Sequence, residues 1–209
     1  MADEKSRGEE QGIAAGGASF RSSLWLRCLY GLGLILGCWL AMQAVHELGH
    51  VMGAWVTGGK VVHVELAPWS ISRTDVLPNP DPLTVCWAGP ITGCGLPLLL
   101  WLALRSTSNR IASISALFAG FCLIANGTYL GSAVSSPVGD AADLLNHGAP
   151  LWQLLLFSGV TVPPGVWMWH RLTLMQLGLS PRARPPAVPV IVGLWTAILA
   201  DVFAHSLVR

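Results

Sequence analysis

The stretch LGLILGCWLAMQAVHELGHVMGAW, residues 32–55, is long and apolar enough to cross a bilayer as a single helix. It nevertheless contains two histidines and a glutamate, His46, Glu47 and His50. An ionisable side chain near the bilayer centre costs roughly 2.5–3.5 kcal/mol on insertion scales. A membrane helix that keeps three such groups within five residues is therefore expected to use them for function.

The whole chain has the composition of a membrane protein. Of its 209 residues, 53% are hydrophobic and 11% are charged, whereas an ordinary soluble domain has about 25% charged residues. Five apolar runs reach or approach the ~20 residues of a transmembrane helix; they cover 24–55, 83–104, 111–133, 151–169 and 188–208. We therefore expect an all-α, multi-pass membrane protein, a bundle of about five transmembrane helices, in a bacterial cell membrane.

The segments outside these runs predict the domain organisation. Residues 1–23 mix both signs of charge with glycine and alanine, which is typical of a disordered tail. Residues 60–76 alternate apolar and polar side chains around Pro68, which predicts a small β-hairpin after the first span. We expect a functional core over 24–150 and additional transmembrane helices over 151–209.

Charge and cysteine usage exclude some classes of partner and site. The net charge is +1 and the basic residues are scattered, so nucleic acid is not an expected partner. The five cysteines form no C-x-x-C pair, which argues against a disulfide framework or a thiolate zinc cluster. The lipid bilayer is the expected surrounding, and the sequence does not predict an oligomeric state.

The ionisable residues of the first span form the H-E-x-x-H pattern of zinc hydrolases. Residues four apart lie on one face of a helix, so His46 and His50 can bind one metal ion with Glu47 beside it. Two histidines leave room for a third protein ligand and for a water molecule whose pKa zinc lowers toward about 7. The pattern predicts Zn²⁺ as the cofactor and Glu47 as the catalytic base for peptide hydrolysis.

A third protein ligand is expected from the later spans. Asp140 and Asp143, which follow the third apolar run, are the strongest candidates, in that order. Weaker candidates are His147 and the i, i+4 pair Asp201 and His205 in the last run. Either of the first two aspartates could instead cap the N-terminus of a helix.

Three segments resemble the site-2 protease family of intramembrane zinc metalloproteases. HELGH at 46–50 matches its first motif, and AGPITG at 88–93 resembles its Gly-Pro-x-x-Asn segment. PVGDAADLL at 137–145 is similar to its Pro-Leu-Asp-Gly-Gly-Arg-Ile-Leu segment. The resemblance implies that Asp140 is the third metal ligand and that Asn126 corresponds to an asparagine that orients the substrate.

The resemblance covers about residues 28–150 and implies an intramembrane protease that cleaves transmembrane or membrane-anchored proteins. It further implies that a strand of the hairpin holds the substrate in an extended form. Gly93 stands where the family often has asparagine and Ala141 where glycine is usual, so the member would be divergent.

Two other classes of function remain open. A zinc-binding scaffold or chaperone that retains the fold without proteolysis would explain these differences. A transporter would explain polar residues in the spans, but it predicts interrupted helices in two repeated halves, and the sequence shows no internal repeat.

Overall fold

The computed structural model describes the backbone of residues 2–66, 69, 71–180, 182–183 and 186–207, and the side chains of 24–66, 69, 71–108, 110–180, 182–183 and 186–202. The elements are α1 (Ala2–Thr57), β1 (Val61–Glu65), β2 (Arg73–Val76), α2 (Pro82–Leu104), α3 (Asn109–Gly131), the short 3₁₀ helix η1 (Ser132–Val134), α4 (Asp140–Asn146), α5 (Leu151–Arg171) and α6 (Val188–Leu207). These elements confirm a helical membrane bundle with a small hairpin after the first helix.

Four helices within the described residues are long and apolar enough to cross a membrane, where the sequence predicts about five. They cover Leu24–Thr57, Pro82–Leu104, Arg110–Val134 and Leu151–Arg171. The fifth predicted span corresponds to α6. Its apolar part within the described residues, Val188–Val202, is shorter than a full span.

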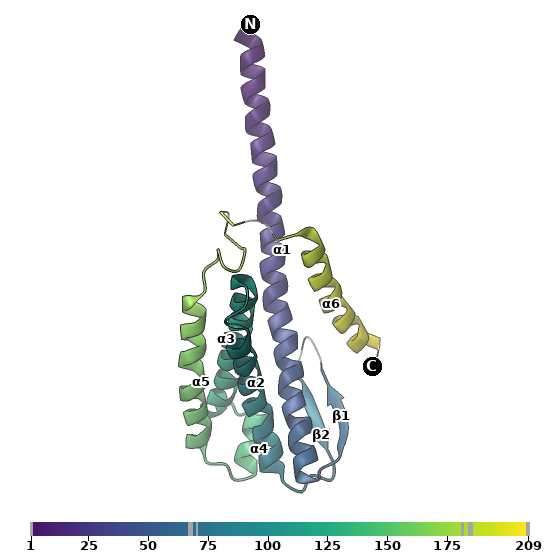
Figure 1. Cartoon of the computed structure of the whole chain (residues 1–209). Helices are drawn as coiled ribbons and strands as arrows, with labels where there is room; N and C mark the ends of the chain where they lie inside the picture. The colour runs from purple at the N-terminus through teal and green to yellow at the C-terminus, as the bar shows by residue number, and fades with distance from the viewer. Residues whose placement is uncertain (1, 67–68, 70, 181, 184–185, 208–209) are drawn as a thin grey trace.

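The helical backbone of α1 includes most of the N-terminal segment. The backbone of α1 is helical from Ala2, where the sequence predicts a disordered tail over 1–23. Figure 1 shows this part of α1 projecting beyond the other elements.

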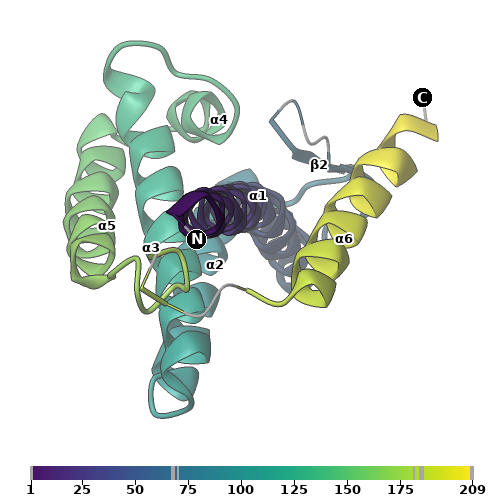
Figure 2. The same cartoon turned by 90° about the horizontal axis from the view of Figure 1, so that it is seen from above.

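Helix α1 runs through the middle of the bundle (Figures 1 and 2). Helices α2, α3 and α5 lie on one side of it, and α6 lies on the other. The hairpin and the short α4 both lie at the end of the bundle away from the N-terminus, beside the second half of α1. The second half of α1 carries His46, Glu47 and His50, so these two small elements are placed next to the predicted site.

Close contact between α1 and α2 depends on small residues. A Cβ atom added to Gly53 would lie 2.7 Å from Cβ of Ala88 and 3.1 Å from Cα of Val85. A Cβ atom on Gly49 would collide with the carbonyl oxygen of Ala88. Small side chains at four-residue spacing let two membrane helices approach closely, and this contact brings the backbone of α2 next to the histidines.

The hairpin follows directly after α1. Gly58 ends the helix with a φ of +76°, a conformation that glycine adopts without strain. The two strands pair antiparallel, with Val64 opposite Thr74 and Glu65 opposite Arg73. The expected hairpin over 60–76 is therefore confirmed, and β2 packs against α1.

Replacing Gly53 by alanine is expected to destabilise the protein by about 1–3 kcal/mol, because the added methyl group overpacks the α1–α2 contact. The matched control is Gly95→Ala in α2, where a Cβ atom meets nothing within 4 Å and alanine favours the helix. Thermal unfolding in detergent measures both variants. A Gly53→Ala variant as stable as Gly95→Ala contradicts the close contact.

Candidate metal centre

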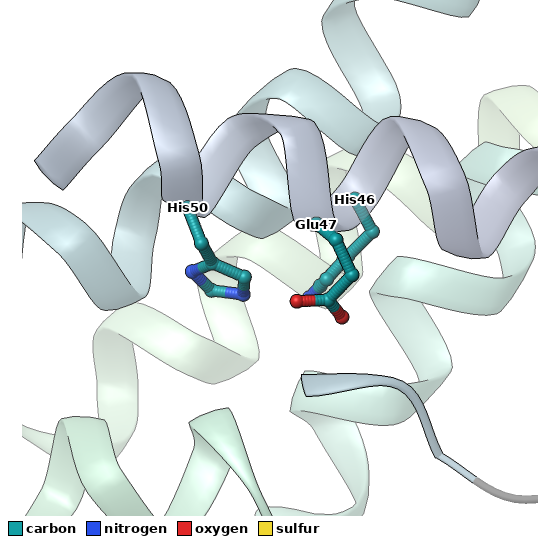
Figure 3. A group of neighbouring side chains, drawn as sticks. All are labelled: His46, Glu47 and His50. Carbon is teal, nitrogen blue, oxygen red and sulfur yellow. The ribbon is translucent and has the colours of Figure 1, made fainter. Parts of the chain in front are cut away.

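His46, Glu47 and His50 lie on one side of α1, and Figure 3 shows their side chains extending in the same direction. One nitrogen or oxygen atom from each of His46, Glu47 and His50 lies within 4.8 Å of the others. All three side chains are buried, with Glu47 only 2% exposed. Burying three such groups together is unfavourable unless each has a partner.

Asp140, the first residue of α4, meets both imidazoles. Its Oδ2 lies 2.7 Å from Nε2 of His46 and 3.3 Å from Nε2 of His50. Among the described residues, the hydrogen bonds and ion pairs of these two nitrogens join them to Asp140 and not to Asp143, which is exposed. The two nitrogens and the oxygen thus form a three-atom donor set.

The approach of Asp140 depends on Tyr129 and Gly139. The backbone N–H of Asp140 donates to the hydroxyl of Tyr129 at 2.9 Å. Gly139 has a φ of +51°, in the left-handed region, and a Cβ atom there would collide with the same hydroxyl. A glycine is therefore required at this position, because the chain turns sharply against Tyr129 before it enters α4.

The second nitrogen of each imidazole has its own partner. Nδ1 of His50 lies 2.8 Å from the carbonyl oxygen of Val85, and Nδ1 of His46 lies 2.6 Å from Oδ1 of Asn126. The amide nitrogen of Asn126 donates to the carbonyl of Cys122, so its oxygen faces His46. Because these oxygens accept, both Nδ1 atoms carry the proton.

The tautomer fixed in this way suits a metal ion. Each Nε2 atom points at the carboxylate of Asp140. Where a metal ion replaces the Nε2 proton, an imidazole that stays protonated on Nδ1 offers its Nε2 lone pair to the ion. Metal-binding histidines commonly donate their other N–H to a carbonyl or carboxylate oxygen, as His46 and His50 do. Two imidazoles and one carboxylate, with a fourth position left for water, form a donor set typical of catalytic zinc.

The charge state of Asp140 is consistent with this role. Burial acts to raise the pKa of its carboxyl group, but hydrogen bonds with His46 and His50 outweigh burial and hold that pKa below its ordinary value. Asp140 is therefore a carboxylate at neutral pH, the form that binds a cation.

The glycines of AGPITG provide space for the buried polar side chains. A Cβ atom on Gly89 would collide with the ring of His50. A Cβ atom on Gly93 would lie 2.9 Å from the amide atoms of Asn126. Gly93, which departs from the asparagine of the resembled family, thus leaves the space that the amide of Asn126 occupies from the neighbouring helix α3.

Glu47 is held by the hairpin. The hydroxyl of Thr74, on β2, donates to Oε2 of Glu47 at 2.6 Å. This bond occupies one oxygen of the carboxylate, and no hydrogen bond or ion pair to the other oxygen occurs among the described residues. The general base predicted from the sequence is thereby tied to an element outside the helical bundle.

Two cavities open onto the site. The smaller has a volume of about 110 Å³ and lies against His46 and Glu47, between Trp39, Met42 and Ala125. The larger, about 570 Å³, reaches His50 and Asp140; its polar lining includes Arg73, Asp75, Asn79, Asp143 and His147. A polar cavity that reaches the histidines gives water a path to them.

Several sequence-predicted candidates lie away from the donor set. His147 and Asp143 line the larger cavity, and Nδ1 of His147 donates to the carbonyl oxygen of Asp143. Asp201 belongs to α6, which packs on α1. The side chain of His205 lies outside the described residues.

The sequence does not predict three partners of the site, which are the backbone carbonyl of Val85, the hydroxyl of Thr74 and the hydroxyl of Tyr129. A backbone oxygen leaves no trace in residue type, and threonine and tyrosine are common outside functional sites. The only sequence signal was the position of Thr74 within the predicted hairpin.

Comparisons of the chain with protein-family models, with curated proteins and with solved structures find no match.

Replacing Asn126 by alanine is expected to weaken zinc binding about 10-fold to 100-fold, because His46 loses the acceptor that fixes its tautomer. Asn126→Asp keeps an acceptor oxygen at the same place and is expected to retain most of the affinity. Competition with a chromophoric zinc chelator measures both variants. Equal affinity for the wild type and Asn126→Ala contradicts the proposed role of Asn126.

Proposed function

We propose that the chain is an intramembrane zinc metalloprotease, a divergent member of the site-2 protease family, in a bacterial cell membrane. Its substrates would be transmembrane or membrane-anchored proteins, cleaved within or close to the bilayer. His46, His50 and Asp140 would bind Zn²⁺, and Glu47 would be the catalytic base.

One observation carries this proposal: Nε2 of His46 and of His50 both meet Oδ2 of Asp140, while each Nδ1 is bound to an accepting oxygen. A histidine pair that served only packing would not need both Nε2 atoms aimed at one carboxylate. The arrangement supports a divalent cation, and the nitrogen-rich donor set favours zinc over magnesium or calcium, which prefer oxygen ligands.

The chemistry follows from the position of each group. When bound, zinc acts as a Lewis acid that lowers the pKa of water and polarises the substrate carbonyl. Glu47 lies beside the two imidazoles and accepts the proton of the attacking water. The same carboxyl group then donates that proton to the nitrogen of the leaving amine, so the peptide C–N bond breaks and Glu47 returns to its starting state.

The hairpin supports the binding of an extended substrate. The sheet consists of β1 and β2 alone within the described residues, so β2 has an edge without a strand partner. Residues of β2 line the larger cavity next to His50 and Asp140. A substrate segment that pairs with this edge through backbone hydrogen bonds would be extended beside the site, with little dependence on its sequence.

Asp140→Ala is expected to remove zinc from the purified protein, whereas Asp143→Ala, which alters a neighbouring carboxylate of the same helix, is expected to retain it. The reason is that, of these two aspartates, Asp140 is the one whose carboxylate contacts Nε2 of His46 and of His50. Metal analysis by inductively coupled plasma mass spectrometry measures both variants. Loss of zinc from Asp143→Ala alone would show that the third ligand is wrongly assigned.

Glu47→Gln is expected to abolish cleavage while zinc remains bound, because the amide keeps the shape of the side chain but cannot accept the proton. Suitable probes are a single-span test protein in proteoliposomes and unfolded casein. Chelation is expected to stop cleavage by the wild type, and added zinc to restore it. Cleavage that survives chelation overturns the proposal, and a cellular function that persists in Glu47→Gln favours the scaffold alternative.

A further inference from the structure

A contact between the hairpin and the predicted general base goes beyond the H-E-x-x-H pattern. Thr74 lies in the middle of β2, and its hydroxyl donates to Oε2 of Glu47 at 2.6 Å. The two residues are 27 positions apart and belong to different elements. Glu47 is 2% exposed, so this hydroxyl stands where water would otherwise solvate the carboxylate.

The alternation of β2 explains why Thr74 is the residue that makes this contact. Successive side chains of a strand point to opposite faces. The side chain of Arg73 is exposed, and its Nε lies 3.4 Å from Oε2 of Glu65 and 3.6 Å from Oδ2 of Asp75. The charged residues of β2 thus pair with one another and with Glu65 of β1, and Thr74 is the residue of β2 whose side chain reaches Glu47.

The contact also gives the two carboxylate oxygens of Glu47 different roles. Oε2 of Glu47 is bound to the hairpin, which leaves Oε1 for the attacking water near the imidazoles. A carboxylate on a flexible side chain has several rotamers, and a hydrogen bond to one oxygen selects among them. Catalysis is sensitive to such orientation, since small misplacements of a reacting group lower the rate strongly.

From these contacts we propose that Thr74 is a positioning residue that orients Glu47 and connects substrate binding to the chemical step. This inference rests on the proposed proteolytic function. A substrate segment paired with the free edge of β2 holds the hairpin against α1, and the hairpin in turn holds Glu47 through Thr74. The general base is then correctly placed when a peptide is in place to be cleaved.

The test uses the full chain in proteoliposomes with the single-span test protein, and in detergent with unfolded casein. Thr74→Val keeps the shape of the side chain and removes the hydroxyl, and it is expected to lower kcat by roughly 10-fold to 100-fold, the effect of losing a hydrogen bond to a charged group. KM and the zinc content are expected to remain as in the wild type. Thr74→Ser restores the hydroxyl and is expected to recover most of the rate.

The matched control is Thr57→Val, because among the described residues the hydroxyl of Thr57 donates to carbonyls of its own helix and not to another element. A second measurement needs no substrate. The rate of hydrogen–deuterium exchange of residues 71–77 is expected to rise in Thr74→Val and in Glu47→Leu. The double variant is expected to exchange no faster than either single variant, because both substitutions remove the same hydrogen bond.

The outcomes separate the two proposals. A wild type that cleaves neither probe overturns the proposed function. An active wild type whose kcat is unchanged in Thr74→Val, or whose Thr74→Val defect lies in KM alone, overturns the role of Thr74 and leaves the proposed function standing. If the increases in exchange rate of the two single variants add up in the double variant, the contact between Thr74 and Glu47 is also contradicted.

Discussion

Two imidazole nitrogens and one carboxylate oxygen lie in contact inside a bundle of apolar helices. The packing around them provides hydrogen-bond and ion-pair partners for these buried groups. His46 and His50 come from one helix, while Asp140 comes from a segment more than 80 residues later. Isolated charges at this depth would be unfavourable, so each group needs a partner. The partners are drawn from α2, α3, α4 and β2, which explains why these four elements converge on the second half of α1.

Small residues make this convergence possible. Gly49 and Gly53 let α1 and α2 touch, and Gly89 and Gly93 leave room for the ring of His50 and the amide of Asn126. Gly139 lets the chain turn against Tyr129 so that Asp140 begins α4 at the right place. Glycine has a low helix propensity, but at these positions it allows polar side chains and backbones to approach closely.

The sequence predicted the parts of the molecule that local pattern determines. Apolar runs predicted the four long helices, alternation predicted the hairpin, and the i, i+4 spacing placed His46 and His50 on one face. It did not predict that the carbonyl of Val85 and the hydroxyl of Thr74 contact the site, because such contacts depend on how separate elements pack. Asn126 shows the difference clearly: the resemblance implied contact with substrate, whereas its oxygen and nitrogen are bound to His46 and Cys122.

Zinc K-edge X-ray absorption of the purified wild-type protein measures the ligands of the proposed metal centre. A centre formed by His46, His50 and Asp140 gives one zinc per chain, with nitrogen and oxygen neighbours at about 2.0–2.2 Å and the outer-shell scattering of two imidazole rings. A sulfur shell at about 2.3 Å would show that cysteines bind the metal, which contradicts this assignment. Failure of the purified protein, with its histidines and Asp140 intact, to bind zinc in stoichiometric amount would contradict it as well.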